Sequence, residues 1–173
     1  MRNVVRSTVS LMWMSLAAST LASEAETSAA AGNNRRGDGF ATATATYEGD
    51  IGFAGTRTHT GEVSLARGLA VGFDEDGLSF SASHAISTRW GIGIARNFTL
   101  TLGRDGQVAV SGGTAVSRGQ RHQSAEAGGW AGSEGHRTVA ASTASGTSDR
   151  RGTVTTRTHA RSLRVERWHR SRD

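Results

Sequence analysis

Large apolar residues alternate with small or polar residues over two long stretches of this chain. From Leu78 to Leu102 the apolar residues stand at even positions, and from Ile51 to Phe73 they stand at odd positions. A period of two is typical of β-strands, whose side chains point alternately to the two faces of a sheet. Single strands seldom exceed about ten residues, so turns must interrupt both stretches. The pattern predicts an all-β fold.

The lengths of the turns predict which strands pair. Two residues that pair across a hairpin share a face, so a loop with an even number of residues moves the apolar set from odd to even positions. This change occurs at the DEDG segment, residues 74–77, where a four-residue loop pairs Phe73 with Leu78 and Val71 with Phe80. An EF-hand calcium loop starting at Asp74 would need a glutamate at its twelfth position, which is occupied by Ala85. DEDG is therefore interpreted as a hairpin turn.

Loops with an odd number of residues keep the apolar set unchanged. Residues 104–106 form such a loop and pair Leu102 with Val108, and Gly106 suits the left-handed position that ends a three-residue loop. Residues 95–97 are interpreted in the same way. The resulting prediction is an antiparallel up-and-down meander of about seven strands within residues 40–117. The expected strands are 40–47, 51–59, 63–73, 78–86, 90–94, 98–103 and 107–117.

The two faces of the predicted sheet differ in side-chain size. We expect the large apolar residues to face a core, so that Val71 and Phe80 are buried neighbours while Ser79 and Ser81 point away from them. The opposite face then displays short hydroxyl side chains and is expected to meet solvent, a glycan or a second copy of the chain. We call these residues the hydroxyl set: Thr42, Thr44, Thr46, Thr56, Thr58, Thr60, Ser64, Ser79, Ser81, Ser83, Thr99 and Thr101.

Large apolar residues are unevenly distributed along the chain. Residues 40–116 hold 19 Leu, Ile, Val and Phe, whereas residues 23–39 and 117–173 together hold four. Chains so poor in these residues seldom fold alone. We therefore expect a flexible segment at 23–39, a β domain at 40–117, a Gly/Ser/Ala-rich linker of low order at 118–149 and an Arg-rich tail at 150–173.

The first 22 residues are typical of an export signal. Arg2 and Arg6 precede a short apolar run from Val9 to Ala18, and small residues follow near Ala22. The run is too short to cross a membrane as a helix. The chain has no cysteine. We expect a secreted or extracytoplasmic protein of the cell envelope that begins near Ser23.

The sequence offers little for catalysis. It contains no nucleophile elbow, P-loop or dinucleotide fingerprint, and no histidine pair with zinc spacing. The acids of residues 40–117 all fall in predicted turns, and one end of the meander collects five of them, which leaves calcium binding there an open question: Glu48, Asp50, Asp74, Glu75 and Asp76. We expect no catalytic residues, no cofactor and no metal centre, and hence a non-enzymatic protein.

Four basic side chains share the predicted apolar face. Alternation places His84 there with Arg67 opposite it across the 74–77 hairpin, and Arg57 and His59 lie on the same face. They form a candidate polar cluster in a buried position, which is where an active site would be if the chain were an enzyme. The alternative is that they lie at a sheet margin with their charged ends in water.

The tail differs from the rest of the chain in charge. Residues 23–149 carry 10 Arg and 13 acids, a net charge of −3, whereas residues 150–173 carry 8 Arg and 2 acids, a net charge of +6. Helical spacing favours a polyanion-binding face made of Arg157, Arg161, Arg164, Arg167 and Trp168. The alternative is one or two strands at a sheet edge, with Val154, Leu163 and Val165 buried.

These features together favour an exported, non-enzymatic β-rich protein with a structural or surface-interaction role. We expect that the chain can associate with copies of itself, since flat sheets with few charges pair readily. The alternative is an extracytoplasmic module that binds a glycan or an envelope polyanion through the hydroxyl set or the Arg-rich tail. No transmembrane helix and no specific nucleic acid are expected.

Overall fold

The computed structural model describes residues 23–34, 36, 38–119, 121–134, 137–149 and 151–164. The described chain is all-β and antiparallel, as predicted, and has ten strands, six of which cover the range 40–117 where about seven were expected. The strands are β1 (Ser23–Asn34), β2 (Gly39–Glu48), β3 (Ile51–His59), β4 (Val63–Asp74), β5 (Gly77–Thr88), β6 (Ile92–Gly103), β7 (Gln107–Arg118), β8 (His122–Glu134), β9 (Arg137–Ser148) and β10 (Thr153–Arg164).

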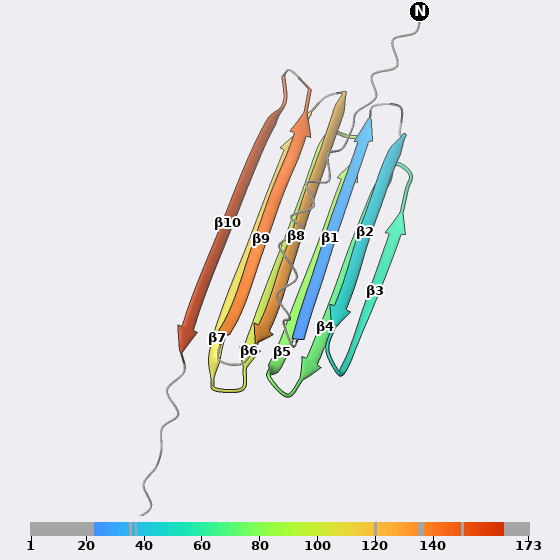
Figure 1. Cartoon of the computed structure of the whole chain (residues 1–173). Coiled ribbons are helices and arrows are strands. Elements are labelled where there is room, and N and C mark those ends of the chain that lie inside the picture. The colour runs from blue at the N-terminus through green and yellow to red at the C-terminus, as the bar shows by residue number, and fades with distance from the viewer. Residues whose placement is uncertain are drawn as a thin grey trace, which may run out of the picture.

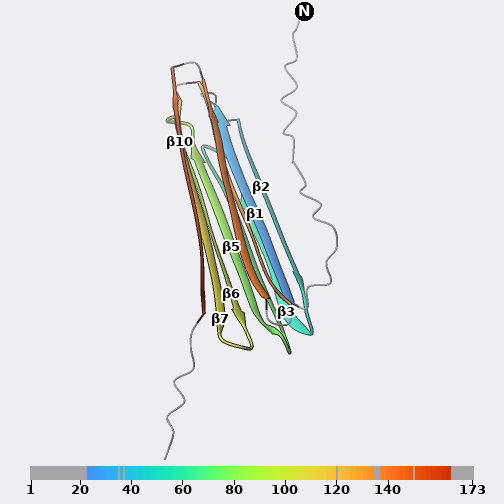
Figure 2. The ribbon, with the colours of Figure 1, turned by 60° about the vertical axis from the view of Figure 1, so that its left-hand side comes forward.

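The strands form two stacked sheets. One sheet has four strands in the order β2-β1-β8-β9, and the other has six in the order β10-β7-β6-β5-β4-β3. Figure 1 shows the smaller sheet lying over the middle of the larger one, with β10 and β3 extending past it on either side. Figure 2 shows the two layers closer to edge-on, as a thin and elongated sandwich. The two edge strands of the larger sheet are therefore exposed on both faces over most of their length.

The predicted register of the larger sheet is confirmed at its two clearest hairpins. Phe73 lies opposite Leu78, and Val71 lies opposite Phe80. Asp74 ends β4 and pairs with Gly77, the first residue of β5, so the turn itself is Glu75 and Asp76, two residues where four were expected. The Oδ1 atom of Asp74 accepts hydrogen bonds from the backbone N–H groups of Asp76 and Gly77, at 2.8 and 3.1 Å. Side-chain acceptance of this kind is what favours Asp in turns.

The hairpin at 104–106 has the predicted register, whereas the loop predicted at 95–97 does not form. Leu102 lies opposite Val108, and Gly106 has a φ of +82°, the left-handed conformation expected of it. A loop at 95–97 was wrong, because β6 runs through these residues without a break. The turn before β6 is at 89–91, where Gly91 has a φ of +95°. Asn97 is instead a buried strand residue whose side chain donates to the carbonyl of Gly128, in the other sheet, at 2.5 Å.

The segments expected to have low order form strands. Residues 23–39 contain β1 and the beginning of β2, residues 118–149 contain β8 and β9, and residues 150–173 contain β10. The prediction of low order was wrong because it counted only large apolar residues, whereas these strands bury small ones. Alanine alternates along the buried side of β1, at Ala25, Ala29 and Ala31, and of β8, as at Ala125.

The prediction of which face is buried was wrong. Ser79 and Ser81 are fully buried between the sheets, whereas Val71 and Phe80 lie on the outer face of the six-stranded sheet and are only half-buried. The two faces of a strand exchange without any change in register or alternation. The core consists of small side chains, including Ala66, Ala85, Ala95, Ala115 and Ala127, packed with serine, threonine and glycine.

Small side chains let the two backbones approach each other closely. A Cβ atom added to Gly68 of β4 would lie 2.6 Å from the carbonyl oxygen of Thr44 of β2. One added to Gly72 would lie 2.6 Å from the carbonyl oxygen of Glu48 and 2.7 Å from that of Glu24. These two glycines therefore permit contact between the sheets that no other residue type would allow.

Hydroxyl groups bridge the interface between the sheets. Ser23 of β1 lies 2.9 Å from Ser79 of β5, measured between the Oγ atoms. The hydroxyl of Ser81 donates to the carbonyl of Gly129 of β8 at 2.8 Å, and Ser111 of β7 lies 2.6 Å from Ser142 of β9. Hydrogen bonding satisfies these buried oxygens and fixes the position of one sheet on the other.

The hydroxyl set is consequently divided between two environments. Six of its members are buried between the sheets: Ser64, Ser79, Ser81, Ser83, Thr99 and Thr101. Thr42, Thr44 and Thr46 are exposed on the outer face of the four-stranded sheet. The β3 residues Thr56 and Thr58 are exposed because no strand of the smaller sheet covers them, and Thr60 is exposed directly after β3. The single hydroxyl surface that the sequence predicted does not exist.

Candidate functional site

The outer face of the six-stranded sheet is rich in large apolar side chains. Phe53 is 52% exposed, Phe73 is 51% exposed and Phe98 is 44% exposed. Rows of apolar residues cross the strands here, as in Phe53, Val71, Phe80, Leu100 and Val110 of β3, β4, β5, β6 and β7. Large contiguous apolar patches on a protein surface mark interaction sites. We call this surface the apolar face.

A line of basic side chains crosses the middle of the apolar face. Arg57 lies opposite Arg67, and Arg67 lies opposite His84. His84 lies opposite Arg96, and the same line continues through Thr114 of β7 to Arg157 of β10. We call Arg57, Arg67, His84, Arg96 and Arg157 the basic row. It spans all six strands at right angles to their direction.

The basic row has no internal compensation of charge. Like charges directly opposite each other on neighbouring strands destabilise a sheet. The strand residues that face outward on the described part of this sheet include no aspartate or glutamate. The ion pair between Arg89 and Glu62 lies outside the row. The row is therefore a cationic feature that no described outward-facing strand residue of this sheet neutralises.

The position of His84 between two arginines affects its pKa. Partial burial, followed by the charges of Arg96 and Arg67, lowers the pKa of His84 from its ordinary value. A positive neighbour on each side disfavours a third positive charge between them. At neutral pH the imidazole is therefore uncharged, and the arginines carry the charge of the row.

A shallow hollow of about 350 Å³ lies on the apolar face between β7 and β10. It is lined by Thr114, Val116, Arg118, Thr153, Thr155 and Arg157. Two guanidinium groups and three hydroxyl groups meet there around one valine. Such a set of donors suits an oxyanion such as a phosphate.

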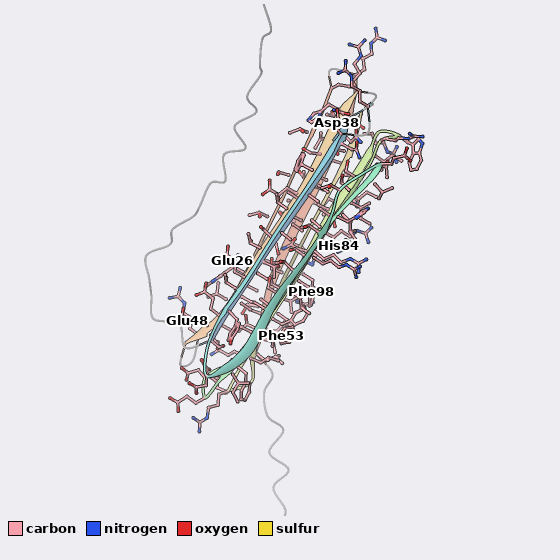
Figure 3. The ribbon with its side chains drawn as sticks, turned by 90° about the vertical axis from the view of Figure 1, so that its right-hand side faces the viewer. Glu26, Asp38, Glu48, Phe53, His84 and Phe98 are labelled. Atoms are coloured by element: carbon pink, nitrogen blue, oxygen red, sulfur yellow. The ribbon has the colours of Figure 1, made fainter. Side chains whose placement is uncertain are left out.

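The outer face of the four-stranded sheet has the opposite character. It carries Glu24, Glu26, Glu48 and Glu126 together with exposed threonines, and we call it the acidic face. Figure 3 shows Glu26 and Glu48 on one outer side of the sandwich and His84 and Phe98 on the other. The sandwich is thus polarised across its thickness, with carboxylates and hydroxyls on one side and arginines and apolar groups on the other.

Glu24 is the most perturbed carboxyl group of the acidic face. Burial is the main cause that raises its pKa, and the neighbouring charges of Glu26 and Glu48 raise it further. The indole N–H of Trp130 donates a hydrogen bond to Glu24, which opposes these effects. The net result favours the protonated form of Glu24.

Known proteins give no guide to this site. Comparison with protein-family models, with curated proteins and with solved structures found no match.

The candidate polar cluster falls within the apolar face. Arg57, Arg67 and His84 lie in adjacent positions of the basic row, and His59 lies two residues further along β3 on the same face. The expectation that these groups are buried was wrong, because the whole face points outward and all four side chains are exposed. Arg96 shares the alternation of His84, so the sequence contained the signal that extends the row.

The described part of the tail that was predicted to bind a polyanion, residues 153–164, forms a strand and not a helix. Arg157 and Arg161 alternate with His159 on one face of β10, and this period of two was the signal that the helical interpretation missed. Arg164 ends β10, whereas Arg167 and Trp168 lie outside the described residues, as does the export signal at 1–22. The edge-strand alternative was correct in type, but Val154 and Leu163 are 41% and 45% exposed, not buried.

The acidic turns do gather at one end of the sandwich. A shallow hollow there is lined by Asp50, Asp74 and Glu75 together with Arg104 and apolar residues. In the part of the chain that the structure describes, no group of three or more acidic or histidine side chains is placed to hold a metal ion. The described residues also contain no helix of the length and apolar character needed to span a membrane.

Proposed function

We propose that this chain is an exported, non-enzymatic surface-interaction protein that binds an anionic partner through the apolar face. The observation that carries the proposal is the basic row in the middle of that face, with no carboxylate beside it. A row of like charges and a sheet of exposed phenylalanines both cost stability in the free protein. A partner that covers the face would remove both costs.

The non-enzymatic part of the proposal rests on where the acids lie. General acid and base catalysis needs ionisable groups that converge on a reacting atom. The described acids are distributed between turns and the acidic face, on the far side of the sandwich from the basic row. His84, the one histidine inside the row, is flanked by arginines and lacks the carboxylate neighbour that orients a catalytic imidazole.

Export is proposed from the sequence of residues 1–22. The proposal is tested by expressing the full chain in a secreting host and sequencing the N-terminus of the exported protein. We expect a start near Ser23, which is also where β1 begins. Exported protein that still begins at Met1 would contradict this expectation.

A polyanion or glycan is the second candidate partner. Arg157 and Arg161 of β10 face the same side as the rest of the basic row, and Arg118 and Arg157 line the hollow between β7 and β10. Thr42, Thr44 and Thr46 offer exposed hydroxyls to a glycan on the acidic face. A soluble polyanion would engage the arginines but not the apolar residues around them.

The proposed function is tested with two variants of equal charge. In the face variant Arg57, Arg67, Arg96 and Arg157 become glutamine. In the control variant the same change is made at exposed arginines outside the apolar face: Arg36, Arg121, Arg137 and Arg151. Both variants are compared with the unchanged chain for binding to heparin, as a polyanion, and to anionic lipid vesicles.

The expected result is that the unchanged chain and the control variant bind at least one of the two probes and the face variant binds neither. Circular dichroism and thermal melting check that both variants are folded. Equal loss of binding in the two variants would show that net charge alone is responsible. Failure of the unchanged chain to bind either probe would contradict the proposed function.

A further inference from the structure

We propose that the partner is an anionic lipid surface, on which the protein lies flat with its apolar face in the boundary between headgroups and acyl chains. This inference rests on the proposed function and names the partner of the same surface. It follows from the distribution of charge and apolar area on the two sides of the sandwich. Each of the following observations favours a lipid surface over another occupant.

The first observation is that apolar rows lie on both sides of the basic row. Toward one end of the strands lie Phe53, Phe80 and Leu100, and toward the other end lie Leu65 and Ile94. A soluble polyanion would contact the guanidinium groups and leave these side chains in water. A lipid leaflet offers phosphates to the arginines and hydrocarbon to the residues on either side. The long arginine side chains reach the phosphate level from within such a face.

The second observation argues against a second copy of the chain. The basic row crosses the sheet near the middle of its strands, so two copies packed face to face about a twofold axis would bring Arg67 and Arg96 against the same row of the other copy. The described outward-facing residues of this sheet supply no carboxylate to neutralise that contact. Apposed like charges at an interface are strongly unfavourable.

The third observation is the polarity of the sandwich. Glu24, Glu26, Glu48 and Glu126 lie on the face opposite to the arginines (Figure 3). An anionic surface attracts the basic row and repels these carboxylates, so the field of the lipid favours one orientation of the protein. The hydroxyl and carboxylate groups then remain in water, where they are well solvated.

The hollow between β7 and β10 is the place on this face where one lipid headgroup would be held. Arg118 and Arg157 stand on either side of it, and Thr114, Thr153 and Thr155 contribute hydroxyl donors. Guanidinium groups bind phosphate oxygens in a bidentate manner, and threonine hydroxyls complete such a site. The remainder of the basic row contacts the leaflet without a cavity.

The first experiment measures binding to vesicles. The protein is the chain from Ser23, which retains all ten strands, alongside the full chain. The vesicles are pure phosphatidylcholine, or phosphatidylcholine with about one third phosphatidylglycerol. We expect binding to the anionic vesicles alone, weakened by salt. The face variant should lose about fivefold in partition for each arginine removed, whereas the control variant should lose much less.

An apolar variant separates lipid from polyanion. In this variant Phe53 and Phe98 become serine, which leaves every arginine in place. Binding to anionic vesicles should fall by about tenfold or more through loss of buried aromatic area, and binding to heparin should be unchanged. Both residues are largely exposed, so the fold should tolerate their replacement. Unchanged vesicle binding by this variant would overturn the lipid inference.

A second experiment reports which face touches the lipid. Single tryptophans are introduced at Phe98, on the apolar face, and at Thr44, on the acidic face. Vesicles with brominated acyl chains quench tryptophans that lie near the hydrocarbon. Compared with the unchanged chain, the Phe98→Trp variant should gain a quenched component and the Thr44→Trp variant an unquenched one. The reverse pattern would overturn the proposed orientation.

The outcomes distinguish this inference from the proposed function. Binding to heparin through the basic row without binding to vesicles would overturn the lipid inference and leave the proposed function intact. Binding to neither probe would contradict both. If sedimentation finds a dimer that the apolar variant dissociates, and vesicles are not bound, the occupant of the face is a second copy and the lipid inference is wrong.

Discussion

The hydroxyl oxygen of Thr27 lies 2.8 Å from that of Ser81, across the interface between the two sheets. Both side chains are buried, and the hydroxyl of Ser81 also reaches the carbonyl of Gly129. A serine in this position is thus part of the contact that joins β5 to β1 and β8. The neighbouring residue on β5, Phe80, points to the opposite side and pairs with the ring of Phe98, at a centroid distance of 6.2 Å.

Ser81→Asp should therefore unfold the protein, and Phe80→Asp should leave it folded. The first change places a carboxylate between two closely packed backbones, at a cost of about 3 kcal/mol or more. The second places a charge on an outer face, at a cost of about 1 kcal/mol. Thermal melting followed by circular dichroism measures both. A stable Ser81→Asp protein beside an unfolded Phe80→Asp protein would mean that the buried and outer faces are exchanged.

The close approach at Gly68 gives a second prediction. Gly68→Ala should destabilise the sandwich by about 1–3 kcal/mol, because the new Cβ atom meets the carbonyl oxygen of Thr44 and the sheets must move apart. The matched control is Gly55→Ala on the edge strand β3, where an added Cβ atom has nothing within 4 Å. That change should be neutral or slightly stabilising. Equal effects in chemical denaturation would contradict the direct backbone contact.

The raised pKa of Glu24 predicts that the stability of the fold depends on pH. Its pKa is raised in the folded state, so between its ordinary value of 4.5 and that raised value the folded chain binds more protons than the unfolded chain. Stability is then lost as the pH rises through this range. Glu24→Gln removes the loss and retains an acceptor for Trp130. The variant should melt slightly higher than the unchanged chain at pH 7, and the difference should vanish below about pH 4.5.

The measurement for Glu24 is a series of melting curves between acid and neutral pH. Glu126→Gln is a suitable control on the same face, since Glu126 is a partly exposed strand residue four positions from Trp130. A Glu24→Gln protein that is less stable than the unchanged chain at pH 7 would show that the charged form is favoured by the Trp130 hydrogen bond.

Ending the chain at Asp149 should preserve cooperative folding. The truncation removes β10, whose side chains from Thr153 to Leu163 are all exposed, and of which Val154 lies beside Gly146 of β9 in the smaller sheet. We expect a lower melting temperature from the loss of the β7–β10 ladder, and weaker binding to anionic vesicles from the loss of Arg157 and Arg161. A double variant of these two arginines to glutamine separates charge from strand pairing. Loss of the cooperative melt would mean that β10 is required for the fold.

Strand type and the register of the hairpins at 74–77 and 104–106 could be predicted from the sequence because turn length and alternation determine them. The pairing of β2 with β3 that a meander implies does not form, because β2 pairs with β1 in the other sheet. The pairs Phe73–Leu78 and Leu102–Val108 follow from counting residues in the turns. The buried face could not be predicted in this way, because alternation is the same whichever face is inside. Which face is buried is decided by the second sheet, whose strands β1, β8 and β9 carry few large apolar side chains and were therefore interpreted as flexible.

For the candidate site, the sequence likewise predicted which residues share a face but not whether that face is exposed. Arg57, Arg67 and His84 were placed on one face by alternation alone, and they occupy one row of the sheet. Arg157 was not placed with them, because β10 pairs with β7 across an intervening hairpin and no local signal reveals such a pairing. The exposure of the row follows only from the stacking of the two sheets.

The interface of small side chains has a thermodynamic consequence. The heat capacity increase on unfolding comes from newly hydrated apolar area and is reduced by newly hydrated polar area. Here the surfaces that unfolding separates are made of alanine, glycine and hydroxyl groups, while many phenylalanines and leucines are already in contact with water in the folded state. The free energy of unfolding should therefore curve only weakly with temperature, and a calorimetric scan should show a small heat capacity increase on unfolding, with cold denaturation displaced to lower temperature.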